Sequence, residues 1–113
     1  MLTRDDVQRF LSQFFPKMDI WGIIFLNREK NLEALKELSI NASYREQIIR
    51  SLVVEDFVET LESTILGCGE MWVFGKDFDV KQLYIKIAMG SPNSKTICIS
   101  FHIAEKPIKY KFK

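Results

Sequence analysis

The sequence predicts an α+β domain in which N-terminal helices pack on a small antiparallel β-sheet. Two observations lead to this class. In the first half of the chain, apolar residues recur every three to four positions, which is typical of amphipathic helices. From about residue 71 onward they recur at every second position, which is typical of strands with one buried face. The 113 residues contain no repeat and no linker, so a single domain spanning residues 1–113 is expected.

Three helices are expected. The first begins after an N-cap at Thr3, and Pro16 is expected to end it because proline lacks the N–H that a helix interior requires. A second is expected at residues 30–38, with leucines on one face. The third begins at a capping box, in which Ser43 and Glu46 each satisfy a backbone N–H of the other residue.

Strands are expected mainly in the second half of the chain. The segments with strand patterns are residues 20–25, 71–74, 83–89, 96–103 and 108–113. Residues 57–65 are ambiguous, and residues 67–69 and 75–77 contain glycines that indicate turns. Lysines alternate with apolar residues over residues 108–113, which is typical of a terminal edge strand whose outward charges prevent further pairing.

The segments 83–89 and 96–103 are expected to pair as a hairpin with one apolar face. The other face carries Tyr84 and Lys86 from one strand and Ser100 and His102 from the other. Directly opposed residues share a face, so their numbers must add to an even value. A value of 184 places Tyr84 opposite Ser100, whereas 186 places it opposite His102. Both registers gather the four polar side chains, and the sequence leaves the choice open.

These four side chains offer the groups that metal-free RNA cleavage needs. Histidine titrates near neutral pH, so His102, the only histidine, can take up a proton and return it. Lys86 can stabilise charge that develops on a phosphate, and Tyr84 can orient the substrate or stack on a base. His102, Lys86 and Tyr84 are therefore candidate catalytic residues. The further candidates, for RNA binding, are Lys76, Trp72, Ser100, Lys109 and Lys111.

Each of these features also has a purely structural explanation. Polar residues on the outer face of a strand are usually only solvated. An aromatic residue such as Trp72 is more often part of a core than a platform for bases. Lysines on an edge strand protect first against aggregation.

Composition argues against several classes of protein. No apolar run reaches about 18 residues and the N-terminus lacks a signal-like layout, so a cytoplasmic protein without membrane contact is expected. Cys68 and Cys98 are expected to be free thiols. No phosphate loop or metal-ligand spacing occurs, so neither cofactor nor metal is expected. Residues 1–70 carry 8 Lys/Arg against 12 Asp/Glu, and residues 71–113 carry 8 against 3, as in a chain whose second half faces a polyanion.

Several motifs together resemble the motility quorum-sensing regulator (MqsR) family of type II toxins. They are Glu55-Asp56-Phe57, Met71-Trp72-Val73-Phe74-Gly75-Lys76, Leu83-Tyr84-Ile85-Lys86-Ile87 and Ile99-Ser100-Phe101-His102. The resemblance spans roughly residues 25–113 and leaves the first helix outside. It implies a RelE-like ribonuclease fold and the toxin of a bacterial toxin–antitoxin system. Such a toxin is an mRNA interferase, a metal-independent endoribonuclease hydrolase that binds mRNA and is silenced by a cognate antitoxin.

The resemblance also assigns positions in this chain. The functional tyrosine of the family corresponds to Tyr84, and a catalytic lysine corresponds to His102. A second lysine falls near Glu59 and a glutamine falls on Val73, so two family residues are replaced here. The resemblance implies an endoribonuclease toxin with His102 as general acid or base. The alternative is a non-catalytic RNA- or protein-binding module on the same scaffold.

Overall fold

The computed structural model describes residues 1–63 and 69–113, and it confirms the α+β class. Its elements are α1 (Arg4–Trp21), β1 (Ile23–Phe25), α2 (Glu29–Glu37), α3 (Tyr44–Arg50), the 3-10 turn η1 (Val54–Asp56), β2 (Phe57–Leu61), β3 (Met71–Phe78), β4 (Lys81–Ala88) and β5 (Thr96–Ile103). The strand order among the described residues is β1-β5-β4-β3-β2. β1 runs parallel to β5 and the other neighbours are antiparallel. The sheet is therefore mixed, whereas a purely antiparallel sheet was predicted, because local patterns do not reveal strand direction.

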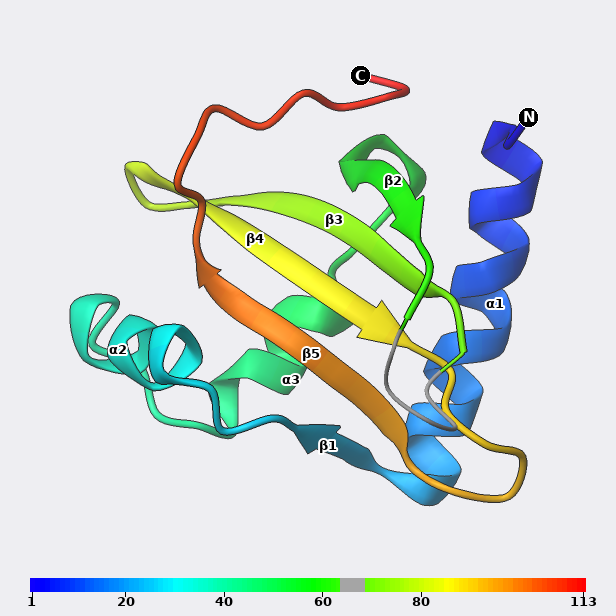
Figure 1. Ribbon diagram of the computed structural model, residues 1–113, viewed down its shortest axis with the longest axis horizontal. Coiled ribbons are helices and arrows are strands. Elements are labelled where there is room, and N and C mark those ends of the chain that lie inside the picture. The colour runs from blue at the N-terminus through cyan, green and yellow to red at the C-terminus, as the bar shows by residue number, and fades with distance from the viewer. Residues whose placement is uncertain (64–68) are drawn as a thin grey trace.

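The main core lies between one face of the sheet and the helices α1 and α3, which lie behind the sheet in Figure 1. Val7, Phe14 and Met18 line the inner face of α1 and are at most 1% exposed. They pack with Phe74 of β3 and Ile85 of β4, which are fully buried. Burying one side chain of this size contributes about 1.5–3 kcal/mol to the free energy of folding, so this layer holds α1 firmly on the sheet. The other face of the sheet is not covered by α1.

α1 is longer than predicted because it continues through Pro16. A proline in a helix interior costs about 3 kcal/mol. The next turn is held by tertiary contacts: Met18 is buried, and the Lys17 ammonium donates to the carbonyl of Ser91 (2.9 Å). The helix ends at Gly22, whose φ of +89° suits glycine. The strand expected at residues 20–25 therefore begins only at residue 23, and it is partly exposed.

Of the two helix caps predicted from the sequence, the one at Thr3 is confirmed. At Thr3 the hydroxyl accepts the N–H of Asp6 (3.3 Å), and the Asp6 carboxylate accepts the N–H of Thr3 (2.8 Å). The capping box predicted at Ser43 is wrong. The Asn41 side-chain oxygen instead accepts both the N–H of Tyr44 (3.1 Å) and the Ser43 hydroxyl (2.9 Å). Asn41 therefore supplies the side-chain cap of α3.

Asn31 of α2 continues the edge of the sheet where β1 ends. Its Nδ2 donates to the carbonyl of Ile99 (3.0 Å), and its Oδ1 accepts the N–H of Phe101 (2.9 Å). One buried side chain thus satisfies two backbone groups of β5 that have no strand beside them. The leucine face predicted for α2 is wrong in part, because Asn31 and Ala34 are the buried residues and Leu32 is exposed.

A β-bulge in β5 exchanges the two faces of that strand. Lys86 lies opposite Ser100, but Ile87 lies opposite Cys98, so Ile99 is the extra residue. Cys98 is buried in the main core, whereas Ile99 is buried on the other face. The single apolar face expected for the hairpin is therefore wrong for the first half of β5. Ile97 and Ile99 lie on the opposite face from Phe101 and Ile103, because one added residue inverts the alternation.

The C-terminal segment, residues 104–113, is not the edge strand that was predicted. It leaves β5 and runs across the end of β3 and β4 toward α1 (Figure 1). Ile108 and Tyr110 lie against Gly75, and the Phe112 ring stacks on Phe57 (6.0 Å between ring centres). The apolar residues therefore pack on the protein and the lysines stay exposed, although the backbone of this segment forms no ladder.

Gly75 does not turn the chain as predicted, because β3 continues through it to residue 78. The turn to β4 follows at Asp79, whose φ is +58°. The ambiguous segment 57–65 begins with β2 at residues 57–61, and its residues 64 and 65 lie outside the described residues. Residues 67 and 68 of the turn expected at residues 67–69 also lie outside them.

Candidate functional site

A pocket lies on the face of the sheet opposite α1, between α2 and the C-terminal segment. It has a volume of about 770 Å³, which is within the range of small-ligand sites. Polar side chains of β4 and β5 line it, together with Arg28 and Lys30 at the start of α2 and with residues 104–109. Val58 of β2 also lines it, so the pocket brings together four stretches that are far apart in the sequence: residues 28–30, Val58, residues 84–86 and residues 100–109.

The polar residues predicted on the outer faces of β4 and β5 all line this pocket. Tyr84 lies opposite His102, and Lys86 lies opposite Ser100, so the register is the one whose residue numbers add to 186. The rings of Tyr84 and His102 stack, with centres 5.2 Å apart and planes inclined by 17°. The Lys86 ammonium lies 5.8 Å from the centre of the Tyr84 ring. Ser100 is only 4% exposed, so it contributes to the floor of the pocket.

One hydrogen bond indicates which tautomer the neutral His102 ring adopts. Its Nδ1 lies 2.9 Å from the carbonyl oxygen of Ile103. A carbonyl oxygen can only accept, so Nδ1 carries the proton in this contact. Nε2 is then the nitrogen with the free lone pair, and it is the one available to accept a proton from a substrate.

The environments of Lys86 and Tyr84 shift the pKa of both groups. Burial, together with the nearby Arg28 charge, lowers the pKa of Lys86, and Glu59 opposes this shift. Burial raises the pKa of Tyr84, and the Glu59 charge adds to the effect. The Tyr84 hydroxyl therefore stays protonated at neutral pH and can donate a hydrogen bond.

Positive charge dominates the lining of the pocket. The cationic residues are Arg28, Lys30, Lys86, Lys106 and Lys109, and the one carboxylate in the lining is Glu105. Glu105 forms an ion pair with Lys30, and this contact holds the pKa of Glu105 below its usual range. The remaining cations of the lining form no ion pair with a carboxylate of the described residues. Such a pocket is suited to an anionic ligand.

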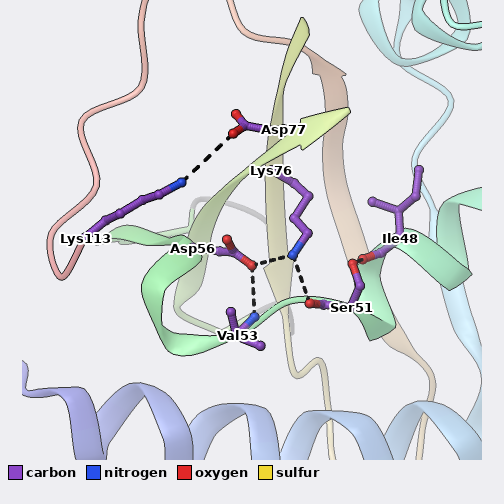
Figure 2. Close-up of polar contacts among 7 residues, drawn as sticks. All are labelled: Ile48, Ser51, Val53, Asp56, Lys76, Asp77 and Lys113. Carbon is purple, nitrogen blue, oxygen red and sulfur yellow. Dashed lines mark hydrogen bonds and ion pairs between the residues drawn. The ribbon is translucent and has the colours of Figure 1, made fainter. Parts of the chain in front are cut away.

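Two predicted RNA-binding residues lie on the opposite face of the sheet. Trp72 stacks on Phe10 of α1, with ring centres 4.2 Å apart, so it is part of the core packing. Figure 2 shows Lys76 directed toward η1, where its ammonium donates to the Asp56 carboxylate and to the Ser51 carbonyl (both 3.0 Å). Both residues therefore have structural partners, and the structure does not bring them to the pocket.

The two predicted C-terminal lysines differ in position. Lys109 lines the pocket, whereas Lys111 is exposed and does not. Arg28, Lys30 and Lys106 were not predicted as site residues. Lys106 belongs to the basic second half of the chain and could have been suspected, but Arg28 and Lys30 precede or begin a helix and carry no local signal.

The resemblance to the MqsR toxins implies a glutamine at Val73 and a lysine near Glu59, and Val73 lies beside the pocket residue Lys86. Val73 on β3 is opposite Lys86 on one side and opposite Glu59 of β2 on the other.

Comparison of the chain with protein-family models, curated proteins and solved structures finds no match. The resemblance to the MqsR toxins therefore stays a prediction.

A metal ion usually needs a set of ligand side chains gathered at one place in the protein. Within residues 1–63 and 69–113, no group of three or more His, Cys, Asp or Glu residues is placed to hold one. Cys98 is fully buried, and burial raises the pKa of its thiol to about 12. Cys68 lies outside the described residues. No helix of the described segments has both the length and the apolar character needed to cross a bilayer.

Proposed function

We propose that the protein is an endoribonuclease that cleaves mRNA without a metal ion and acts as the toxin of a type II toxin–antitoxin system. The observation that carries this proposal is the pocket itself, where a stacked Tyr84–His102 pair is surrounded by cations with few neutralising carboxylates. A phosphate backbone supplies the missing negative charge, and an unpaired base fits the exposed ring surface.

The proposed reaction is an attack by the ribose 2′-oxygen on the adjacent phosphorus. Nε2 of His102 takes the proton of the 2′-hydroxyl while the new O–P bond forms. The bond from phosphorus to the 5′-oxygen breaks, and the departing oxygen takes a proton from solvent. The products are a 2′,3′-cyclic phosphate and a 5′-hydroxyl end.

The other two candidate catalytic residues act on the same phosphate and its nucleotide. The Lys86 ammonium stabilises the negative charge that grows on the phosphate oxygens. The Tyr84 hydroxyl stays protonated and orients the substrate by donating a hydrogen bond. Proton transfer by a positioned side chain is typically worth 10²–10⁴-fold in rate, which sets the loss expected when His102 is replaced.

A cleavage assay with purified protein tests the proposal. Wild type should cleave a labelled RNA in the presence of a metal chelator, and an RNA with 2′-deoxy nucleotides at the cleaved positions should stay intact. His102→Gln should lower the rate by about 10²–10⁴-fold. Lys81→Gln, at an exposed position outside the pocket, is the control and should cleave normally. An RNA left intact by wild type, or cleaved equally by His102→Gln, would contradict the proposal.

The second candidate function is a non-catalytic RNA- or protein-binding module. It is favoured by Glu59 and Val73, which stand where the MqsR family carries a lysine and a glutamine. Tight, salt-dependent RNA binding without cleavage would identify this function.

In the toxin proposal the protein acts on mRNA in the cytoplasm, and a cognate antitoxin would restore growth when both are expressed.

A further inference from the structure

Arg28 and Lys86 are two cations that line the same pocket from different elements. Arg28 is the residue before α2, and Lys86 lies on the face of β4 that lines the pocket. Neither forms a hydrogen bond or an ion pair through its side chain with the described residues. Both side chains line one pocket of about 770 Å³, and the Arg28 charge adds to burial in lowering the pKa of Lys86.

The neighbouring charges do not remove this repulsion. Lys30, which also lines the pocket, is occupied by Glu105. Glu59 attracts Lys86, but it forms no ion pair with it, and burial together with Arg28 outweighs this attraction. Holding two like charges near each other costs free energy in the empty protein, and an anion placed between them would reverse the sign of the interaction.

We propose that Arg28 and Lys86 hold between them the phosphate group that is cleaved, which makes Arg28 a second residue stabilising charge on that phosphate. This inference rests on the function proposed above and adds to it the position of the reacting group. The guanidinium can donate two parallel hydrogen bonds to phosphate oxygens, whereas the ammonium acts as a point charge. Lys86 is partly buried and Arg28 is exposed, so the arginine approaches the phosphate from the open side of the pocket.

A phosphate held at Lys86 would have a defined position relative to Tyr84 and His102. Lys86 is next to Tyr84 on the same strand face and opposite Ser100, so a phosphate at Lys86 lies one pair of residues away from His102. This is the neighbourhood in which a ribose attached to that phosphate can reach the His102 ring. Lys106 and Lys109 belong to the C-terminal segment, which also lines the pocket, and would contact flanking phosphates instead.

The inference predicts opposite effects on stability and on binding. Arg28→Gln removes a repulsive charge, so the ligand-free variant should be at least as stable as wild type in urea unfolding. The same variant should bind inorganic phosphate and a nuclease-resistant deoxyribo-oligonucleotide about 10–100-fold more weakly, the usual range for losing a hydrogen bond to a charged group. Lys86→Gln should weaken binding similarly, and the double variant by less than the product of the two effects, because both residues contact one group.

Isothermal titration at constant ionic strength measures these affinities, with Lys81→Gln as the charge-matched control that should bind like wild type. Unchanged affinity of Arg28→Gln for both probes would overturn the inference, and so would an effect confined to inorganic phosphate. Weaker binding of the oligonucleotide supports it, with or without an effect on phosphate. A wild type that binds phosphate through Arg28 but cleaves no RNA would overturn the proposed function and leave the anion site standing.

Discussion

Replacing Gly75 by alanine should loosen the C-terminal segment that forms one wall of the pocket. A Cβ added at Gly75 would lie 2.7 Å from Cδ1 and 2.9 Å from Cγ2 of Ile108, and 3.0 Å from Cε1 of Tyr110. Ordinary contacts begin near 3.4 Å, so Ile108 would have to move by about 0.7 Å. Cγ2 moves only by rotation about χ1, which is restricted in a β-branched residue, so relief of the clash requires Ile108 to leave its rotamer or its position.

The magnitude follows from the cost of inserting one methyl group into a packed site, which is about 1–3 kcal/mol. Alanine also restricts the unfolded chain, and this offsets about 0.4–1 kcal/mol. We therefore expect a net loss of about 0.5–2 kcal/mol in the free energy of unfolding, measured by urea denaturation. The displaced segment carries Lys106 and Lys109, so affinity for a deoxyribo-oligonucleotide should fall as well.

The double variant Gly75→Ala/Ile108→Ala provides the matched control. Ile108→Ala removes the two atoms closest to the new methyl group and leaves only the contact with Tyr110, so Gly75→Ala should cost much less in that background. The reasoning would be refuted if Gly75→Ala were as stable as wild type, or if its cost were the same with and without Ile108. Either result would mean that the C-terminal segment does not rest on Gly75.

Three further predictions address other parts of the structure. Asn31→Leu should lower the free energy of unfolding by about 2–4 kcal/mol in urea denaturation, because two buried backbone groups of β5 lose their partner. In a Cys68→Ser background, Cys98 should react with a thiol reagent at pH 8 only as fast as the protein unfolds, and rapid labelling of folded protein would contradict its burial. The pKa of the Cys98 thiol is about 12 in the folded protein and lower in the unfolded chain, where the thiol is not buried. The free energy of unfolding should therefore fall as pH rises above about 9, because only the unfolded chain then loses the thiol proton. Lys106→Gln should reduce by about one the slope of log affinity against log salt for an oligonucleotide, whereas Lys81→Gln should leave it unchanged.

Part of the candidate site followed from side-chain alternation alone. Tyr84, Lys86, Ser100 and His102 share a face in any register with an even sum, so the sequence could place them together without choosing between registers. The structure selects the register that sets Tyr84 against His102 and allows their rings to stack. The site could be predicted to this extent because these residues lie on the His102 side of the bulge, where the alternation is unbroken.

The rest of the pocket depends on contacts that no local pattern contains. Arg28 and Lys30 reach the pocket because Asn31 fixes α2 to the edge of β5. Trp72 and Lys76 share the face that α1 and η1 cover, so they are removed from the site although their residue types suit RNA.

The sequence by itself determined the α+β class, the N-cap of α1, the span of β5 and the shared face of Tyr84, Lys86, Ser100 and His102. These features depend on residue spacing of 3.6 or 2 and on side-chain to backbone bonds within one turn, which are local. Only the tertiary structure decided that α1 passes through Pro16, that β5 carries a bulge, and that the C-terminal segment covers Gly75. In each case, packing between distant segments outweighs the local preference of the chain.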